Sequence, residues 1–407
     1  MSTSRCDLRQ NEWSALLSLG FRPFFLVAGI WSALALALWI LMLLSGFAVP
    51  SRFDPLTWYI HEMLFGYVGA AIAGFLLTAI PNWTGRTPLR GKPLACLVAF
   101  WLVGRITCLF SAFVPLWLAA ALDIVFPAAL FSVVARDIVA ARNWRNLLLP
   151  MPVALLCIAD LLMFLENGGF NVPQGLGWRL GLATIVILLS VIGTRIVPVF
   201  TRNWLLAHGI AAPLATHGLL DRAALGVLHG GLIGWAFAPS EPIFGVVLIL
   251  AAALNLVRVV HWRGHRARSD PLLLILHVGY LWIVIGAALL GAALLDAALP
   301  LAAGIHAFTA GAMSTMILAV MTRVSLAHTG RLLEADGLTT SLYLMINVAA
   351  VTRIAAAFLG GELQMPLLVF SAILWIASFA TFVGRYGPML VSASGYEIRA
   401  MSNAHSS

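Results

Sequence analysis

Long apolar runs alternate with short polar segments along almost the whole chain. A helix that crosses a bilayer needs about 20 predominantly apolar residues, and most of the runs reach that length. The segments between them are short, so neighbouring helices are expected to pack antiparallel. The pattern predicts an all-α polytopic membrane protein with about twelve spans, at residues 24–45, 58–80, 94–112, 115–135, 150–166, 178–198, 222–238, 242–260, 271–293, 300–322, 339–358 and 365–385.

Composition supports a membrane protein and excludes a soluble one. Of the 407 residues, 61% are hydrophobic and 10% are charged, which is far from the averages of soluble domains. We therefore predict one integral membrane domain over residues 1–407, with short cytoplasmic tails at 1–20 and 386–407. The polar start runs directly into a full-length apolar run without a cleavage site, so no removable signal peptide is expected.

Positive charge is concentrated in alternate loops. Arg52 and Arg179 are the only basic residues expected on one side, and Arg105 and Arg353 lie inside spans, so the other 20 of the 24 lysines and arginines share the opposite side. Cytoplasmic loops carry an excess of Lys and Arg, so this side and both termini are predicted to be cytoplasmic. The basic residues do not gather on one face with aromatic side chains, which argues against a nucleic-acid partner.

A short motif occurs twice. Residues 61–66 read His-Glu-Met-Leu-Phe-Gly and residues 306–311 read His-Ala-Phe-Thr-Ala-Gly, an offset of 245 positions (306 minus 61), and Thr-Gly-Arg follows each copy at the same offset. A fainter copy lies in the span at 178–198, where Trp178 takes the place of the histidine. The repeat is compatible with three four-helix units.

His61 and His306 both stand a few residues inside the outer end of spans that run inward. Ionisable groups inside spans are costly and are functional candidates by default. Two imidazoles at one depth are the usual arrangement for a bis-histidine haem, so we predict that they are its axial ligands. The chain has no C-x-x-C-H motif, so the haem would be non-covalent and b-type. The alternative is that each histidine hydrogen-bonds a backbone carbonyl.

Two arginines are candidates for binding the haem propionates. Arg105 and Arg353 both fall in the outer half of spans that run outward, where an outer-leaflet haem would need cations. The alternative is a buried ion pair between one of them and Asp123. Glu62 lies about 100° around the helix from His61, so it is not expected to share the face of the histidine but to orient a neighbour or to lie at the membrane interface.

Three further histidines are candidates for an inner metal site. His277, His229 and His328 lie within spans or near their cytoplasmic ends, and together they could hold copper or a second haem, because imidazole suits iron and copper. The alternative for each is a polar residue satisfied by a neighbour. The four cysteines form no C-x-x-C pair and are expected to be buried structural thiols.

The chain resembles the NnrS family. The resemblance rests on several segments spread over the chain, at residues 61–63, 74–79, 83–86, 195–201, 276–280, 306–307, 320–323 and 328–331. It implies a multi-pass protein of the bacterial inner membrane that contains haem and copper. It also implies a role in the nitric oxide response, in nitrosative stress and in denitrification, with nitric oxide or iron-nitrosyl species as partners and an electron donor that the resemblance does not identify.

A second resemblance is architectural. Axial histidines in the second and tenth of twelve helices are similar to those of the catalytic subunit of haem–copper oxidases. That superfamily has another histidine two positions before the one matched by His306, where this chain has Gly304, and among the matching copper-ligand helices only His229 is present. The comparison implies that a low-spin haem site is retained and the binuclear site is not.

Three functions stay open on the sequence. The first is a haem-binding protein of the nitric oxide response. The second is an oxidoreductase that transforms nitric oxide, which would need an open iron coordination position. The third is a haem-free transporter or channel, suggested by the repeat and by the intramembrane residues Arg105, Asp123 and Arg353.

Overall fold

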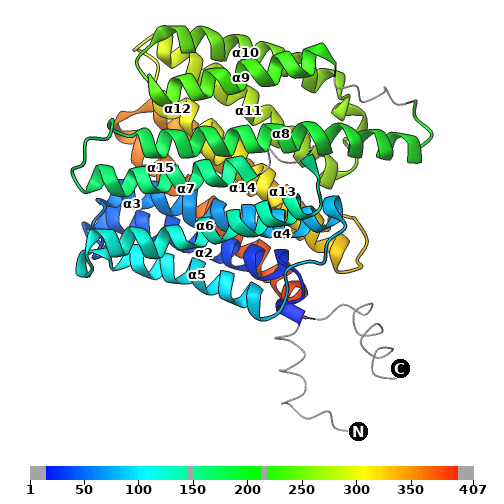
Figure 1. Cartoon of the computed structure of the whole chain (residues 1–407). Helices are drawn as coiled ribbons and strands as arrows, with labels where there is room; N and C mark the ends of the chain where they lie inside the picture. The colour runs from blue at the N-terminus through cyan, green and yellow to red at the C-terminus, as the bar shows by residue number, and fades with distance from the viewer. Residues whose placement is uncertain (1–14, 145–149, 212–217, 393–407) are drawn as a thin grey trace. The chain divides into compact units, whose positions relative to one another are not determined.

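The computed structural model describes residues 15–144, 150–211 and 218–392 (Figure 1). These residues form helices and connecting loops and contain no strand. The helices are α2 (Phe21–Ser45), α3 (Pro55–His61) continued by η1 (Glu62–Tyr67) and α4 (Val68–Thr84), α5 (Lys92–Leu109), α6 (Leu116–Ala140), α7 (Pro150–Asn167), α8 (Leu176–Ala207), α9 (Leu219–Phe237), α10 (Pro242–His261), α11 (Pro271–Leu295), α12 (Leu301–His306) continued by η5 (Ala307–Met313) and α13 (Ser314–His328), α14 (Gly337–Leu359) and α15 (Gly361–Val391).

Each of the twelve predicted spans corresponds to one of these continuous helices, which confirms the polytopic all-α class. Eleven of them are long and apolar enough to cross a membrane. The twelfth, α9, has 19 residues and carries Asp221, Arg222 and His229, which lower its apolar character. Asp221 pairs with Arg258 of α10, with 2.6 Å between the carboxylate oxygen and Nε. The aspartate that lowers the hydropathy of α9 therefore has a buried cationic partner.

The exposed surface of the helices is rich in large apolar side chains. Leu41, Trp117, Leu344 and Phe370 are among those that lie open to the surroundings. Soluble proteins rarely expose continuous apolar surface on this scale, whereas a helix in contact with lipid requires it. The pattern supports helices that sit in a bilayer.

The chain divides into two compact units. Unit 1 comprises residues 1–178, 320–333 and 379–407, and unit 2 comprises residues 179–319 and 334–378. In unit 1, α4 packs against α2 and α6, and α6 also contacts α5 and α7. In unit 2, α10 packs between α9 and α11, while α11 and α14 both contact the α12–η5 segment. This division does not follow three four-helix units, because α8, α13 and α15 each contribute residues to both units.

The predicted cytoplasmic tails, 1–20 and 386–407, stay a prediction. Residues 1–14 and 393–407 lie outside the described part of the chain, and α15 continues to Val391.

Arg22, expected in a cytoplasmic loop, is fully buried in α2. Its Nη1 donates to the carbonyl oxygens of Met389, Leu390 and Ser392, at 3.3, 3.1 and 2.7 Å. A cation is favourable at these free carbonyls, which explains why the helix extends so far.

The repeat predicted from the sequence has a structural counterpart. A π-helix begins immediately after each histidine, η1 at Glu62 and η5 at Ala307, and these two residues are again 245 positions apart (307 minus 62). Each π-helix also packs its repeated glycine against a tryptophan. A Cβ added to Gly66 would lie 2.8 Å from Trp31 Nε1, and one on Gly311 would lie 2.5 Å from the Trp282 ring.

Candidate functional site

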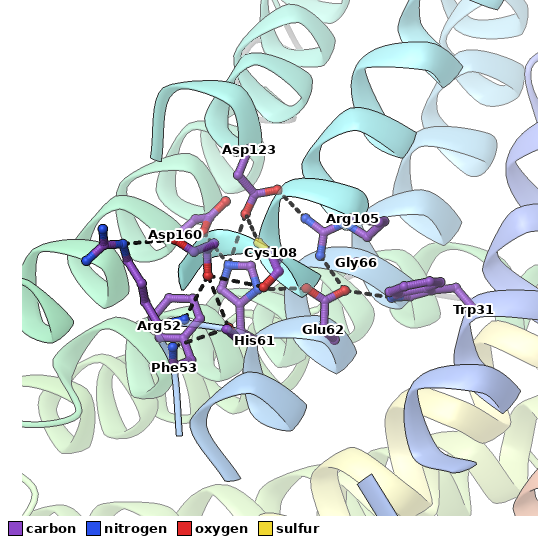
Figure 2. Close-up of polar contacts among 12 residues, drawn as sticks. Trp31, Arg52, Phe53, His61, Glu62, Gly66, Arg105, Cys108, Asp123 and Asp160 are labelled. Atoms are coloured by element: carbon purple, nitrogen blue, oxygen red, sulfur yellow. Dashed lines mark hydrogen bonds and ion pairs between the residues drawn. The ribbon is translucent and has the colours of Figure 1, made fainter. Parts of the chain in front are cut away.

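Six side chains from four helices meet in unit 1 (Figure 2). Every one of them is at most 2% exposed. We call this group the His61 cluster, and it comprises His61 at the end of α3, Glu62 at the start of η1, Arg105 and Cys108 of α5, Asp123 of α6 and Asp160 of α7.

The four helices contribute these residues at one common depth. His61 lies six residues after Pro55, the first residue of α3, and Asp160 lies seven residues before Asn167, the last of α7. Arg105 and Asp123 lie at similar distances from the end of α5 and the start of α6. With a rise of about 1.5 Å per residue, all four are about 6–10 Å from their helix ends. The predicted topology assigns this end to the outer face.

Both ring nitrogens of His61 face carboxylates. Nδ1 lies 3.2 Å from Glu62 Oε1, and Nε2 lies 2.8 Å from Asp160 Oδ1 and 3.1 Å from Asp123 Oδ2. Phe53, Phe65 and Phe164 enclose the imidazole, with ring centroids 5.1, 5.3 and 5.5 Å away. The histidine is therefore held in one orientation by acids and by aromatic packing.

Arg105 joins two of the carboxylates. Its Nη1 lies 2.8 Å from Glu62 Oε2, and its Nη2 forms an ion pair with Asp123. The buried ion pair that the sequence offered as the alternative role of Arg105 is thereby confirmed. The Nε of Arg105 has no hydrogen-bond partner among the described residues.

The position of Glu62 differs from the expectation. It was predicted to point away from the face of His61, yet its carboxylate lies against His61 Nδ1 and also accepts a 2.7 Å hydrogen bond from Trp31 Nε1. The wider π-helical turn starts at Glu62, and the long side chain spans the remaining angle. Glu62 therefore orients the histidine directly.

A loop covers the cluster at these helix ends. The Nε of Arg52 donates to the carbonyl oxygen of Ser111 at 2.9 Å, and its Nη2 donates to that of Val114 at 2.7 Å. Asn167 of α7 donates to the carbonyl oxygen of Arg52 at 3.1 Å. The next residue, Phe53, is 4% exposed and stacks on His61. Arg52, which the sequence marked as an exception to the charge rule, thus holds the loop in place.

His306 has different surroundings, in unit 2. Its Nδ1 lies 3.5 Å from Thr309 Oγ1, at the limit of a hydrogen bond, and its Nε2 has no hydrogen bond to any described residue. Arg353 is half-buried in α14, a helix that packs against α12. His306 can therefore offer a ring nitrogen to a ligand, and the role of Arg353 at a propionate stays a prediction.

The three histidines of the predicted inner site have separate partners. His277 Nε2 lies 2.8 Å from Thr201 Oγ1, and His229 Nε2 lies 2.8 Å from Ser190 Oγ, while His328 packs on the ring of Phe21. Among the described residues, the groups of three or more metal-binding side chains close enough to share one ion are His61–Glu62–Cys108 and His61–Asp123–Asp160. These contacts do not bring the three histidines together, so they give no support to the predicted inner metal site.

Two residues of the cluster were not identified from the sequence as site residues. Asp160 interrupts an apolar run, which is the same signal that drew attention to Asp123. The cysteines were expected to be buried structural thiols, and Cys108 is buried, whereas Cys157 is half-buried and Cys96 is exposed. The Sγ of Cys108 lies 3.4 Å from Asp123 Oδ2, which places a thiol beside the carboxylates. Cys6 lies outside the described residues.

The two repeated histidines differ in how they fit a haem. Neither nitrogen of His61 faces open space, so its surroundings fit a metal ion among carboxylates better than a porphyrin. His306 keeps a nitrogen that an axial bond would use. The bis-histidine haem stays a prediction.

Comparison with models of protein families gives a match over most of the chain. No curated protein matches the chain. The family model described as NnrS protein matches residues 15–394, a range that includes all of the described residues. The match is in line with the resemblance seen in the sequence motifs. The chain belongs to the NnrS family.

Proposed function

We propose that this chain is a multi-pass protein of the bacterial inner membrane that acts in the nitric oxide response through metal cofactors held beside His61 and His306. Family membership supports the nitric oxide response, and the eleven apolar helices support a multi-pass membrane protein. The observation that carries the proposal is the π-helix that follows each histidine.

A π-helix is a costly departure from regular α-helix. Single π turns occur frequently at functional sites, where they change the direction of a side chain without ending the helix. Here the change occurs twice, at one offset, and each time directly after a histidine within a span. A structural role alone would not require the histidine and the π turn to coincide in both copies.

Haem is the cofactor that we assign to the His306 side. His306 would hold a haem through Nε2, and Arg353 on the adjacent helix would offer a cation to a propionate. Such a haem would supply iron that can bind nitric oxide.

The test is the optical spectrum of the purified protein in detergent, oxidised, reduced, and reduced with nitric oxide. We expect a Soret band that shifts when nitric oxide is added, and a His306→Ala variant that loses most of the haem. His261→Ala is the matched control, because His261 is exposed at the end of α10 and should not affect haem content. Folded wild-type protein without a Soret band would overturn the haem assignment and favour the haem-free transporter. Full haem in His306→Ala would overturn the ligand.

The topology is part of the proposal. With α9 counted as a span, both termini lie in the cytoplasm and the His61 cluster lies toward the periplasm. Reporter fusions at the two ends test this orientation, and we expect a cytoplasmic reporter to be active at both. A periplasmic signal at one end would mean that α9 does not cross the membrane.

A further inference from the structure

We propose that the His61 cluster binds one first-row transition-metal dication through His61 Nε2, Asp123 and Asp160. This deepens the proposed function, on which the biological role of the ion rests, and assigns the non-haem metal to named residues in unit 1. The site is argued from four features of the cluster.

The first feature is the spacing of the donor atoms. The Nε2 of His61 lies 2.8 Å from Asp160 Oδ1 and 3.1 Å from Asp123 Oδ2, and one donor atom from each of the three residues lies within 4.8 Å of the others. Two donors that each lie about 2.1 Å from a metal, at a right angle, are about 3 Å apart. The two distances from the imidazole thus match those between ligands of one ion, and the two carboxylates lie within 4.8 Å of each other, so small side-chain movements would admit the ion.

The second feature is the hydrogen bond at the other ring nitrogen. A metal-binding histidine usually donates its second N–H to a carboxylate, which fixes the tautomer and the ring orientation. Glu62 Oε1 occupies that place, 3.2 Å from Nδ1. Glu62 is itself held by Arg105 and Trp31, at 2.8 and 2.7 Å. The carboxylate that would fix the orientation of a metal-bound imidazole is therefore already in place at Nδ1.

The third feature is charge. Glu62, Asp123 and Asp160 bring three carboxylates together, and Arg105 is the one guanidinium that pairs with them in the cluster. With a neutral imidazole the buried cluster would carry a charge of minus two. Unbalanced charge is very unfavourable away from water, and a dication removes the imbalance completely.

The fourth feature is a small cavity beside one of the donors, Asp160. It has a volume of about 20 Å³ and is lined by Asp160 and Arg105 together with apolar side chains of η1, α4, α6 and α7. A cavity of roughly 10–15 Å³ is enough for a water molecule. Arg105, whose Nε has no hydrogen-bond partner among the described residues, is one of the residues that line this space.

The donor types select the class of metal. Imidazole suits iron, copper and zinc, whereas Mg²⁺ and Ca²⁺ prefer sites made only of oxygen. The Sγ of Cys108, 3.4 Å from Asp123 Oδ2, adds a softer atom at the edge of the site. Cu²⁺ forms the most stable complexes in the divalent series and gives an electron paramagnetic resonance signal, so it is the probe of choice.

The experiment measures non-haem metal in full-length protein purified with a histidine-free affinity tag. After chelator treatment, the protein is loaded with Cu²⁺, and bound copper is counted by mass spectrometry. We expect one copper per chain and a resonance spectrum with coupling to one imidazole nitrogen. Asp160→Asn should weaken copper binding at least tenfold. Asp137→Asn is the matched control. Like Asp160, Asp137 is a buried carboxylate with a charged partner, but it lies near the last residue of α6, away from the cluster.

A second variant, together with the wild type, tests the site even if Asp160→Asn does not fold. His61→Gln should abolish the nitrogen coupling, and size-exclusion elution reports whether each variant is folded. Wild-type protein that binds no copper, or copper without nitrogen coupling, would overturn the site even if the variants misfold. Unchanged binding in folded Asp160→Asn would also overturn it. The Soret band, recorded on the same samples, reports separately on the haem, so failure of one assignment is distinguishable from failure of the other.

Discussion

The Nε2 of His61 lies 2.8 Å from Oδ1 of Asp160, a residue 99 positions further along the chain. Both side chains are fully enclosed, and each alone would be an isolated polar group in a low-dielectric interior. Together they connect the end of α3 to α7, so the position of α7 is tied to the start of the π-helix η1.

Among the residues of the His61 cluster, Arg105 is expected to contribute most to the stability of the folded protein. An Arg105→Leu substitution keeps a long side chain but leaves Glu62 and Asp123 without their cation. Breaking a buried ion pair on one side typically costs about 3–5 kcal/mol, because the remaining charge stays buried and unpaired. Thermal unfolding in detergent should show a large loss of stability.

Arg136→Leu is the control for that loss. Arg136 also pairs with an aspartate, Asp137, at 3.0 Å, but its side chain is 58% exposed. Exposed pairs contribute about 0–1 kcal/mol, so this variant should unfold close to the wild type. Equal effects of the two substitutions would contradict a special role for the buried network.

The membrane helices were predictable because their signal is local. A run of apolar residues needs no knowledge of its neighbours, and all twelve predicted spans correspond to helices. The one helix that falls short as a span, α9, does so because Asp221 and Arg222 lie in its first turn. Its partner Arg258 belongs to another helix, so the compensation for Asp221 cannot be seen in a hydropathy profile.

The cluster was only partly predictable because it depends on contacts between helices. The repeat drew attention to His61, and intramembrane charge drew attention to Arg105 and Asp123. Nothing in the sequence places Asp160 beside His61, since they belong to helices that are not adjacent in the chain. The direction of the Glu62 side chain was predicted wrongly because the prediction assumed a regular α-helix, whereas a π-helix begins at that residue.

Gly66 is predicted to tolerate no side chain. A Cβ there would lie 2.8 Å from both Arg105 Nη1 and Trp31 Nε1, and both of those atoms bond to Glu62. Gly66→Ala should therefore destabilise the protein by about 1–3 kcal/mol through overpacking. It should also lower copper binding, because the support of His61 through Glu62 is displaced.

Gly69→Ala is the matched control for Gly66→Ala. It lies one turn further along the same continuous helix, and the nearest atom to its added Cβ is 3.7 Å away, on Phe126. That distance is ordinary contact, so the free energy of unfolding should stay near that of the wild type. If Gly69→Ala were as harmful as Gly66→Ala, the helix as a whole would be sensitive and the specific contact would not be the cause.

Arg22 is predicted to hold the end of α15. Its guanidinium donates to three carbonyl oxygens near that end, and a hydrogen bond that involves a charged group contributes about 1.5–3 kcal/mol. In Arg22→Ala the last turns of α15 should loosen, and trypsin should cut after Arg385 earlier than in the wild type. Arg90→Ala, which removes an exposed arginine, should leave the cleavage time unchanged.

Metal removal is expected to lower stability through the same cluster. A ligand that binds only the folded protein stabilises it by about 2.7 kcal/mol when its free concentration is a hundred times Kd. Adding Cu²⁺ to chelator-treated wild type should therefore raise the unfolding temperature, whereas Mg²⁺ should not, because the site contains an imidazole. Asp160→Asn should lose most of the copper shift and Asp137→Asn should keep it. A copper shift of equal size in both variants would mean that the ion binds elsewhere on the folded chain, since Asp160 supplies one of the three ligands assigned to it.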